Sequence, residues 1–154
     1  MPTPIENSFG EGDCFFCGPN NPSGLKLVFF HDEASGETFT EYTPTPELCG
    51  QGEVFHGGLQ MGLLDECMWW AGFAATGVKA AVTARASFRF LRPARIGDRL
   101  KAVCWVKSHE GDAIHLRGHI LNSNGEKCTA VKGEFRVVDE ARYAAALKDG
   151  SATD

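Results

Sequence analysis

The fold of this chain is constrained most strongly by the stretch that runs from residue 54 to residue 77. The stretch begins with a His-Gly-Gly turn and then stays apolar over several helical turns. Between residues 59 and 75 its only polar side chains are Gln60, Asp65 and Glu66. A helix that is apolar almost all round belongs in the middle of a domain, where other elements cover it. We therefore expect a buried central helix over residues 57–76, ended by Gly77 in a left-handed conformation.

One face of the expected helix combines glycine with a carboxylate. At about 100° per residue, the face of Asp65 also holds Gly58, Met61, Gly62, Met68, Trp69 and Gly72. Glycine inside a helix costs up to roughly 1 kcal/mol relative to alanine, so this stripe indicates the close approach of another backbone or a ligand. A carboxylate on such a face is costly unless it is paired or used. In the alternative, the helix is only partly buried and both of its acids face solvent.

Composition narrows the class of protein. The chain has 154 residues, of which 43% are hydrophobic and 23% are charged, as expected for one globular domain. A formal net charge of -5 argues against non-specific nucleic-acid binding, which depends on a basic surface. The N-terminus lacks the basic and apolar regions of a secretory signal, and adjacent acids interrupt the apolar helix. We expect a cytoplasmic protein with neither a nucleic-acid nor a membrane partner.

The chain contains six cysteines, and only Cys14 and Cys17 have a motif-like spacing. With irregular spacing elsewhere and no export signal, buried thiols are expected rather than disulfides. Cys-x-x-Cys supplies two of the four ligands that a structural zinc requires, and no second pair follows in the sequence. A packed turn is therefore the expectation here, without a metal or any other cofactor, and a zinc site is the alternative.

Strand patterns lie on both sides of the helix. We expect strands over residues 25–31, 37–43, 81–91, 100–108, 114–121 and 127–138. Residues 1–24 form a turn-rich N-terminal segment, residues 25–138 the domain, and residues 139–154 a frayed or helical acidic tail. This order predicts an α+β fold in which a curved antiparallel sheet wraps around one long helix. Because a single helix cannot cover both sheet faces and all edges, we expect at least a dimer.

Alternation assigns the side chains of two strands to faces. In the strand that follows the helix, one face holds Val82, Ala84, Ala86, Phe88 and Phe90, and the other holds Thr83, Arg85, Ser87 and Arg89. In a later strand His115, Arg117 and His119 share a face opposite apolar residues. We interpret that face as exposed or interfacial rather than as a metal site.

Three motifs in order carry a family resemblance. His56-Gly57-Gly58 is followed by Asp65 nine positions after the histidine, residues 88–98 read FRFLRPARIGD, and residues 21–25 read NPSGL. With these motifs and this element order, residues 22–138 resemble the hotdog-fold acyl-CoA thioesterases, in particular the phenylacetate-pathway-like branch. Glu66 directly follows Asp65, so the choice between the two carboxylates stays open. The Asp-x-x-x-x-His signature of hydratases on the same fold is not found.

The resemblance implies a division of catalytic roles. Gly57 and Gly58 leave the first N–H groups of the helix accessible, and the Gly58 N–H is the expected donor to the developing oxyanion. Asp65 is the expected nucleophile or general base. It lies roughly 10 Å further along the axis at 1.5 Å per residue, too far to share a carbonyl with Gly58 of the same helix. The site is therefore expected to straddle the interface of an antiparallel dimer.

Further site residues follow with alternatives. The family pattern implies that Thr83 positions a water beside Asp65, while His56 either orients the thioester or holds the turn. Arg85, Arg89 and Arg92, with Arg95 nearby, suit the phosphates of coenzyme A, or form a solvated strand face. Met61, Met68 and Trp69 line an acyl or aryl pocket, or belong to the core and dimer contacts.

The sequence therefore predicts a thioester hydrolase. It would convert an acyl- or aryl-CoA thioester to free acid and coenzyme A, as a homodimer or a dimer of dimers. The competing hypotheses are an acyl-CoA-binding protein without catalysis and a hydratase-like enzyme of the same fold.

Overall fold

The computed structural model of the chain describes residues 1–8 and 12–148. Residues 9–11 of the expected N-terminal segment and residues 149–154 of the expected tail lie outside the described residues. The elements are β1 (Thr3–Pro4), β2 (Phe30–Asp32), β3 (Glu37–Tyr42), the 3₁₀ helix η1 (Pro46–Leu48), α1 (Gly57–Thr76), β4 (Ala81–Phe90), β5 (Leu100–Glu110), β6 (Ala113–Leu121), β7 (Lys127–Val137) and α2 (Glu140–Lys148).

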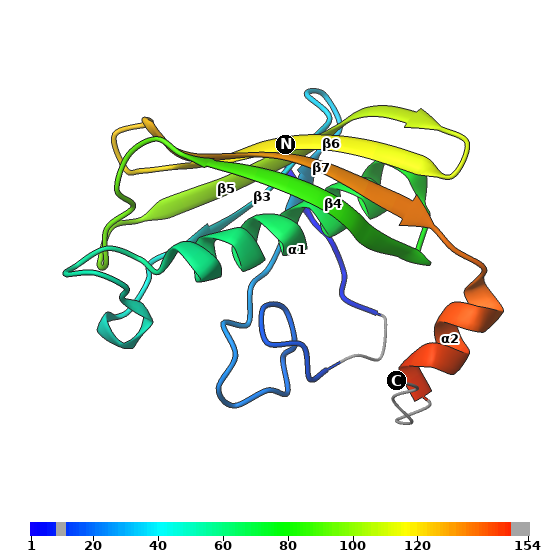
Figure 1. Ribbon diagram of the computed structural model, residues 1–154, viewed down its shortest axis with the longest axis horizontal. Helices are drawn as coiled ribbons and strands as arrows, with labels where there is room; N and C mark the ends of the chain where they lie inside the picture. Colours follow the sequence, from blue (N-terminus) through cyan, green and yellow to red (C-terminus); the bar gives the residue numbers. More distant parts are fainter. Residues whose placement is uncertain (9–11, 149–154) are drawn as a thin grey trace.

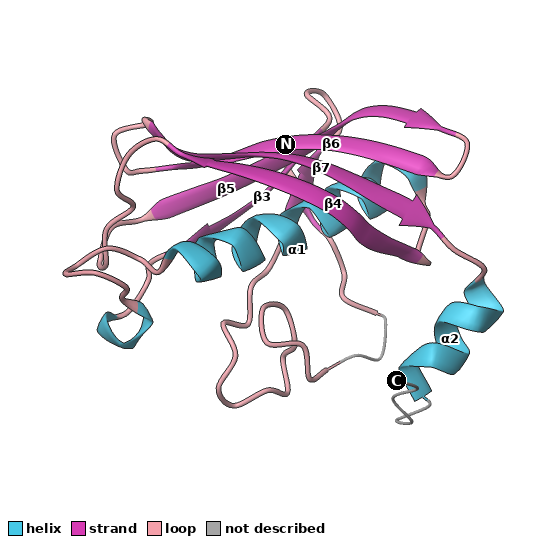
Figure 2. Cartoon of the chain, viewed as in Figure 1, coloured by secondary structure: helices cyan, strands magenta, loops and turns pink. Residues whose placement is uncertain are grey.

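The strands form one antiparallel sheet of seven, in the order β1-β2-β3-β5-β6-β7-β4. The long helix α1 runs along one face of this sheet, and the N-terminal loop lies on the far side of α1 (Figure 1). The short α2 follows β7 and stands apart from the sheet at one end (Figure 2). This arrangement confirms the expected α+β architecture, a curved antiparallel sheet around one long helix. It also leaves β4 as an edge strand.

The expected bounds of the central helix are confirmed, and both ends have identifiable caps. At the start, His56 is the N-cap and its ring accepts the N–H of Gly58. At the end, Gly77 has φ 73°, and its N–H donates to Phe73 O at 2.8 Å. Glycine adopts this left-handed conformation without strain, so the helix stops there.

The core forms where α1 meets the inner face of the sheet. On the helix, the buried apolar side chains are Leu63, Leu64, Cys67, Met68, Trp70 and Ala71. On the sheet, they include Ala102, Cys104, Ile114, Leu116, Ile120, Val131 and Phe135. Burying a side chain of this size contributes about 1.5–3 kcal/mol relative to leaving it exposed. This packing fixes which side of α1 remains available to ligands.

The first hairpin is confirmed, but its first strand is shorter than the expected residues 25–31. Of the expected strand, only residues 30 and 31 pair with β3, and β2 continues to Asp32. The backbone before them is hydrogen-bonded to the N-terminal loop. Leu25 and Leu27 donate their N–H groups to Phe15 O at 2.8 Å and Phe16 O at 2.9 Å. Lys26 between them has φ 50°, outside the extended region. The N-terminal loop thus supplies the hydrogen-bond acceptors for residues 25 and 27 that a neighbouring strand would otherwise supply.

The predicted alternation of β4 is wrong in its first half, because a β-bulge interrupts the strand. Thr83 is opposite Phe135 of β7, but Arg85 is opposite Glu134, so one extra residue lies between them. The bulge places Thr83 on the helix side of the sheet, the same side as Ala86 and Phe88, which pack against the core. Thr83 and Arg85 therefore lie on opposite faces.

The glycine stripe of α1 is approached at Gly62 by a segment of the same chain. A Cβ at Gly62 would lie 2.3 Å from Cζ of Phe16, so the N-terminal loop rests its ring on this glycine. Outside the stripe, a Cβ at Gly57 would lie 3.4 Å from the Phe90 ring of β4. The close approach inferred from the stripe is real at Gly62, and the approaching group is an aromatic side chain.

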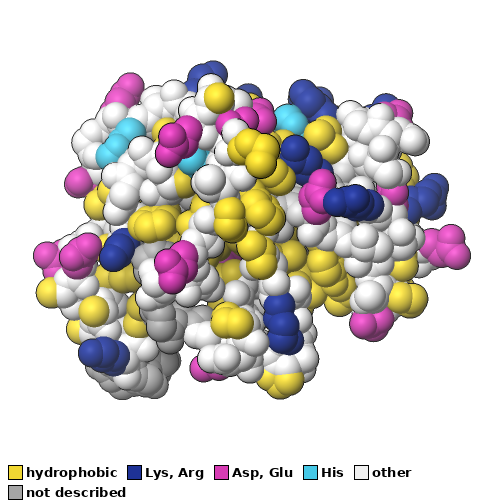
Figure 3. Space-filling view, turned by 180° about the vertical axis from the view of Figure 1, so that it is seen from behind, with side chains coloured by type: hydrophobic (Ala, Val, Ile, Leu, Met, Phe, Trp, Pro, Cys, Tyr) yellow, Lys and Arg dark blue, Asp and Glu magenta, His cyan; other side chains and the backbone are white. Residues whose placement is uncertain are grey.

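The surface of the described residues adds two observations. No described helix combines the length and apolar character needed to cross a membrane. On the face turned away in Figure 1, acidic and basic side chains are interspersed around a band of apolar ones (Figure 3). This face therefore has a mixed charge.

The seating of Phe16 on Gly62 predicts a coupling between the two positions. In a Phe16→Ala protein, Gly62→Ala should stabilise the fold by about 0.5–1 kcal/mol, because alanine is the better helix former. In the wild-type background this gain should be lost or reversed, because the new methyl group displaces the ring. Urea unfolding of the four proteins of the cycle measures the coupling. Equal effects of Gly62→Ala in both backgrounds would contradict the contact.

Candidate functional site

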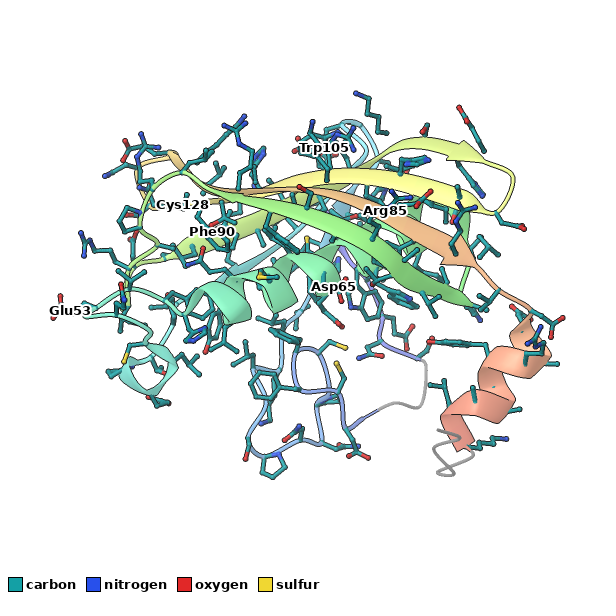
Figure 4. The ribbon with its side chains drawn as sticks, in the orientation of Figure 1. Glu53, Asp65, Arg85, Phe90, Trp105 and Cys128 are labelled. Atoms are coloured by element: carbon teal, nitrogen blue, oxygen red, sulfur yellow. The ribbon has the colours of Figure 1, made fainter. Side chains whose placement is uncertain are left out.

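The centre of the candidate site is a hydrogen bond between the helix and the edge strand. The hydroxyl of Thr83 on β4 donates to Oδ1 of Asp65 on α1 at 2.7 Å. Asp65 lies midway along α1 and is half-buried beside the edge strand β4 (Figure 4). The β-bulge after Thr83 produces this contact, because it turns the hydroxyl to the helix side.

Glu66, the second acid of the helix, has different neighbours. Its Oε1 accepts a hydrogen bond from Trp70 Nε1 at 3.2 Å and lies 3.7 Å from Cys14 Sγ in the N-terminal loop. A rotation of about 100° between successive residues separates the two carboxylates. Asp65 thus meets the edge strand, whereas Glu66 is held among the thiols of the loop.

The N-terminal turn of α1 holds four backbone donors, and three of them have partners. The Gly58 N–H donates to Nδ1 of His56 at 3.0 Å. The N–H groups of Leu59 and Gln60 both donate to the His56 carbonyl. No partner among the described residues takes the Gly57 N–H. His56 therefore serves as a cap here, and a ligand oxygen would have to displace its ring to reach Gly58.

Two shallow hollows adjoin this turn. One has a volume of about 330 Å³ and is lined by Gly57, Phe90 and Arg92 among others. The other, of about 320 Å³, is lined by Glu47, His56 and Gly58 among others. The first turn of the helix thus borders open space on both sides, and Arg92 belongs to the same hollow as Gly57.

The structure separates the expected arginine cluster. Arg85 lies 3.3 Å from Glu134, which alternates with buried residues of β7, so this arginine occupies the sheet face away from α1. Arg92 lies 3.4 Å from Glu126 and donates to Lys127 O at 2.9 Å. Arg89 lies on β4 between them and is exposed. Of the three, only Arg92 is placed at the helix N-terminus.

The three expected pocket residues also have different environments. Met61 is 40% exposed, whereas Met68 is 0% exposed. A Cβ at Gly133 would lie 2.4 Å from Sδ of Met68, so this methionine packs tightly on β7. Met68 therefore lies in the core, which is the second of the two alternatives expected for it. Trp69 is half-buried and stacks on Phe73 with ring centroids 5.8 Å apart.

One cluster of possible metal ligands combines Cys14 and Cys17, for which a zinc site was the alternative, with Glu66, which was not predicted to join them. Cys14, Cys17 and Glu66 each direct a ligand-type atom to one point, and these atoms all lie within 4.8 Å of one another. Burial raises the pKa of the Cys17 thiol, and its hydrogen bond to Glu66 raises it further. The Cys-x-x-Cys spacing was visible in the sequence, but the contribution of the helix was not.

His115, Arg117 and His119 lie on the face of β6 that alternates with buried residues, as expected. Nε2 of His115 lies 3.9 Å from Glu134, the acid that also meets Arg85 and Arg136. The His119 ring lies edge-on to Trp105, with centroids 5.5 Å apart. Trp105 projects from the sheet face away from α1 (Figure 4). These contacts form an ion-pair and aromatic layer on the outer face, away from Asp65.

The sequence profile described as the thioesterase superfamily matches residues 52–129, which include the His-Gly-Gly turn, α1 and β4. The chain belongs to the thioesterase superfamily.

Two curated relatives come from yeasts. An uncharacterised protein of Schizosaccharomyces pombe is 26% identical over 111 residues, which cover 70% of this chain and 63% of that protein. MIOREX complex component 3 of Saccharomyces cerevisiae is 32% identical over 93 residues, which cover 60% of this chain and 34% of that protein. The chain thus spans between about one third and two thirds of the length of these relatives.

Solved structures share the fold of this superfamily member. A thioesterase superfamily protein superposes with a TM-score of 0.74 at 29% identity, over 80% of this chain and 60% of that one. The PaaI protein from the phenylacetic acid degradation operon of Escherichia coli gives 0.66 at 21% identity, over 75% and 81%. An acyl-CoA hydrolase of Staphylococcus aureus, solved with butyryl coenzyme A and coenzyme A, gives 0.64 at 20% identity, over 70% and 66%. At their identities, the last two show a common fold alone.

The cap at the start of α1 predicts a stability effect for His56. His56→Ala removes the acceptor for the Gly58 N–H and should destabilise the protein by about 0.5–1 kcal/mol, the lower part of the range for lost N-caps. His56→Asn supplies another capping oxygen and should recover most of this loss. Chemical denaturation measures both. If the two variants are equally destabilised, the ring does more than cap the helix.

Proposed function

We propose that this protein is an acyl-CoA thioesterase that hydrolyses a small acyl- or aryl-CoA thioester, and that it belongs to the phenylacetate-pathway-like branch with the His-Gly-Gly motif. The observation that carries the proposal is the 2.7 Å hydrogen bond from Thr83 to Asp65. This bond supports Asp65 over Glu66, whose Oε1 accepts a hydrogen bond from Trp70 Nε1. The fold shared with an acyl-CoA hydrolase supports the same substrate class.

The chemistry follows from the two groups. Asp65 attacks the thioester carbonyl or removes a proton from a water that does so, and Thr83 fixes the orientation of its carboxylate. As the carbonyl carbon becomes tetrahedral, its oxygen gains negative charge and needs donors. The Gly57 and Gly58 N–H groups at the positive end of the helix supply them. Gly57 can do so at once, and Gly58 after the substrate oxygen displaces His56.

The distance along the helix favours a site shared between two copies of the chain. Asp65 follows Gly58 by about two turns, roughly 10 Å along the axis, so one carbonyl cannot reach both in a single helix. Edge strand β4 pairs only with β7 among the described strands. Side chains along it and on α1 remain exposed and apolar: Met61, Val82, Phe90 and Leu91. Two copies of β4 joined antiparallel would cover these groups and bring each Asp65 towards the partner's helix N-terminus.

The phosphates of coenzyme A would be held near the helix N-terminus. Arg92 follows β4 and lines the hollow beside Gly57, and Arg89 lies exposed near the end of β4. Guanidinium groups bind phosphate through paired N–H donors. Arg85 lies on the sheet face away from α1, as Arg89 does, but it is paired with Glu134, so we assign it a structural role in place of phosphate binding.

The proposal predicts a graded loss of activity. Asp65→Asn keeps the shape of the side chain but removes its charge, and should lower kcat by about 10²-fold or more. Thr83→Val removes one orienting hydrogen bond, worth about 0.5–1.5 kcal/mol, and should lower kcat by about threefold to tenfold. Release of free coenzyme A from a panel of acyl- and aryl-CoA thioesters, detected with a thiol reagent, measures both.

Asp112→Asn is the matched control, because Asp112 is exposed in the turn between β5 and β6, far along the sheet from α1's first turn. Its kcat should equal that of the wild type. Binding of the thioesters without thiol release by the wild-type protein would replace hydrolysis with a binding function. An Asp65→Asn protein as active as the Asp112→Asn protein would remove Asp65 from the mechanism.

A further inference from the structure

The N-terminal loop and α1 together build a second site, separate from Asp65. Cys14 and Cys17 lie in the loop and Glu66 lies on the helix, 49 positions after Cys17 by their numbering. Their ligand atoms all lie within 4.8 Å of one another, and Cys14 Sγ is 3.7 Å from Glu66 Oε1. Four ligands around a tetrahedral zinc, with Zn–S bonds near 2.3 Å, hold sulfur atoms about 3.8 Å apart. The cluster needs only a small contraction to reach these separations.

The loop has the backbone of a metal-binding turn. The Gly18 N–H donates to Cys14 O at 2.8 Å, and the Cys17 N–H points to Cys14 Sγ at 3.5 Å. An N–H directed at sulfur stabilises the thiolate form that a metal requires. A Cβ at Gly18 would lie 2.4 Å from Cys14 N, so only glycine fits after the second cysteine. These features bring both sulfur atoms to one side of the loop.

Contacts around the cluster hold the two loop cysteines close to Glu66 of the helix. Phe16, between the cysteines, rests on Gly62, one helical turn before Glu66. Trp70 Nε1 donates to Glu66 Oε1 at 3.2 Å and so orients the carboxylate. Such contacts behind the ligands are typical of built metal sites. The ligands therefore do not depend on one flexible surface side chain.

We propose that Cys14, Cys17 and Glu66 bind one zinc ion, with a water molecule as the fourth ligand. Two thiolates and a carboxylate suit Zn²⁺, which takes sulfur and oxygen in tetrahedral geometry. A hollow of about 340 Å³ adjoins the cluster and provides room for the water, and Lys79 lines it. The lysine charge offsets the excess negative charge of the bound site. On binding, the two thiol protons pass to solvent and two Zn–S bonds form.

The ion would join the N-terminal loop to the middle of α1, one residue from Asp65. Metal binding energy then adds to the stability of the folded loop. The site goes beyond thioester hydrolysis, because its ligands belong to another side of the helix from Asp65 and Thr83.

Cobalt spectroscopy on the full chain, stripped of metal and kept reduced, tests the proposal. One equivalent of Co²⁺ should give thiolate-to-cobalt charge-transfer absorption and the intense visible bands of tetrahedral cobalt, and one equivalent of Zn²⁺ should abolish them. Cys14→Ser should lose most of the charge-transfer absorption. Glu66→Gln should keep it but bind Co²⁺ at least about tenfold more weakly, since even outer contacts contribute 10–100-fold. Cys49→Ser, at an exposed cysteine outside the cluster, should match the wild type.

The wild-type titration decides the question without relying on a variant that folds. Absence of charge-transfer absorption from the reduced protein at one equivalent of Co²⁺ overturns the proposal. Unchanged absorption in the Cys14→Ser protein overturns it as well, because the thiolates would then come from elsewhere. Equal affinity of the Glu66→Gln and wild-type proteins would remove the helix from the site and contradict a three-ligand zinc site.

Discussion

The rest of the structure depends on the packing of one apolar helix against the inner face of the sheet. Leu64, Cys67 and Met68 are completely buried there. Once that side of α1 is committed to the core, helical geometry decides where every other residue of the helix faces. Asp65 is directed to the edge strand and Glu66 to the N-terminal loop. Changes to this packing would therefore alter both sites together.

The parts of the fold that were predictable from the sequence are those with strong local signals. The helix from residue 57 to residue 76 has an uninterrupted apolar pattern and a glycine at its end, and its bounds are confirmed. The turns at Gly111 and Gly125 also have local signals, and both glycines have positive φ. The four strands after the helix follow from alternation between such turns. Local propensity and tertiary structure agree in these places.

The errors concern features that depend on distant segments. The bulge near Thr83 arises from pairing with β7, and nothing within β4 itself indicates it. Gly62 accommodates Phe16, which precedes it by more than 40 positions, so the stripe alone could not identify the approaching group. Met68 had two expected alternatives, and it belongs to the core because Gly133 of β7 leaves room for it. In the candidate site, the family resemblance placed Thr83 beside Asp65. The strand register that turns Thr83 towards the helix was not predicted.

Adjacent acids on one helix thus have separate surroundings. In the proposed mechanism, Asp65 of one copy acts with the helix N-terminus of another. A heterodimer tests this directly. One chain carries Asp65→Asn, and the other carries Gly57→Pro with Gly58→Val. The proline removes the N–H at position 57, and the valine side chain blocks access to the N–H at position 58. Proline is tolerated at the first helical position, and His56 before it has ψ 128°, which suits a residue preceding proline. Each variant alone should be inactive, and the heterodimer, isolated with two different tags, should recover about half of the wild-type activity because one of its two sites is intact. A heterodimer as inactive as its parents would contradict a shared site.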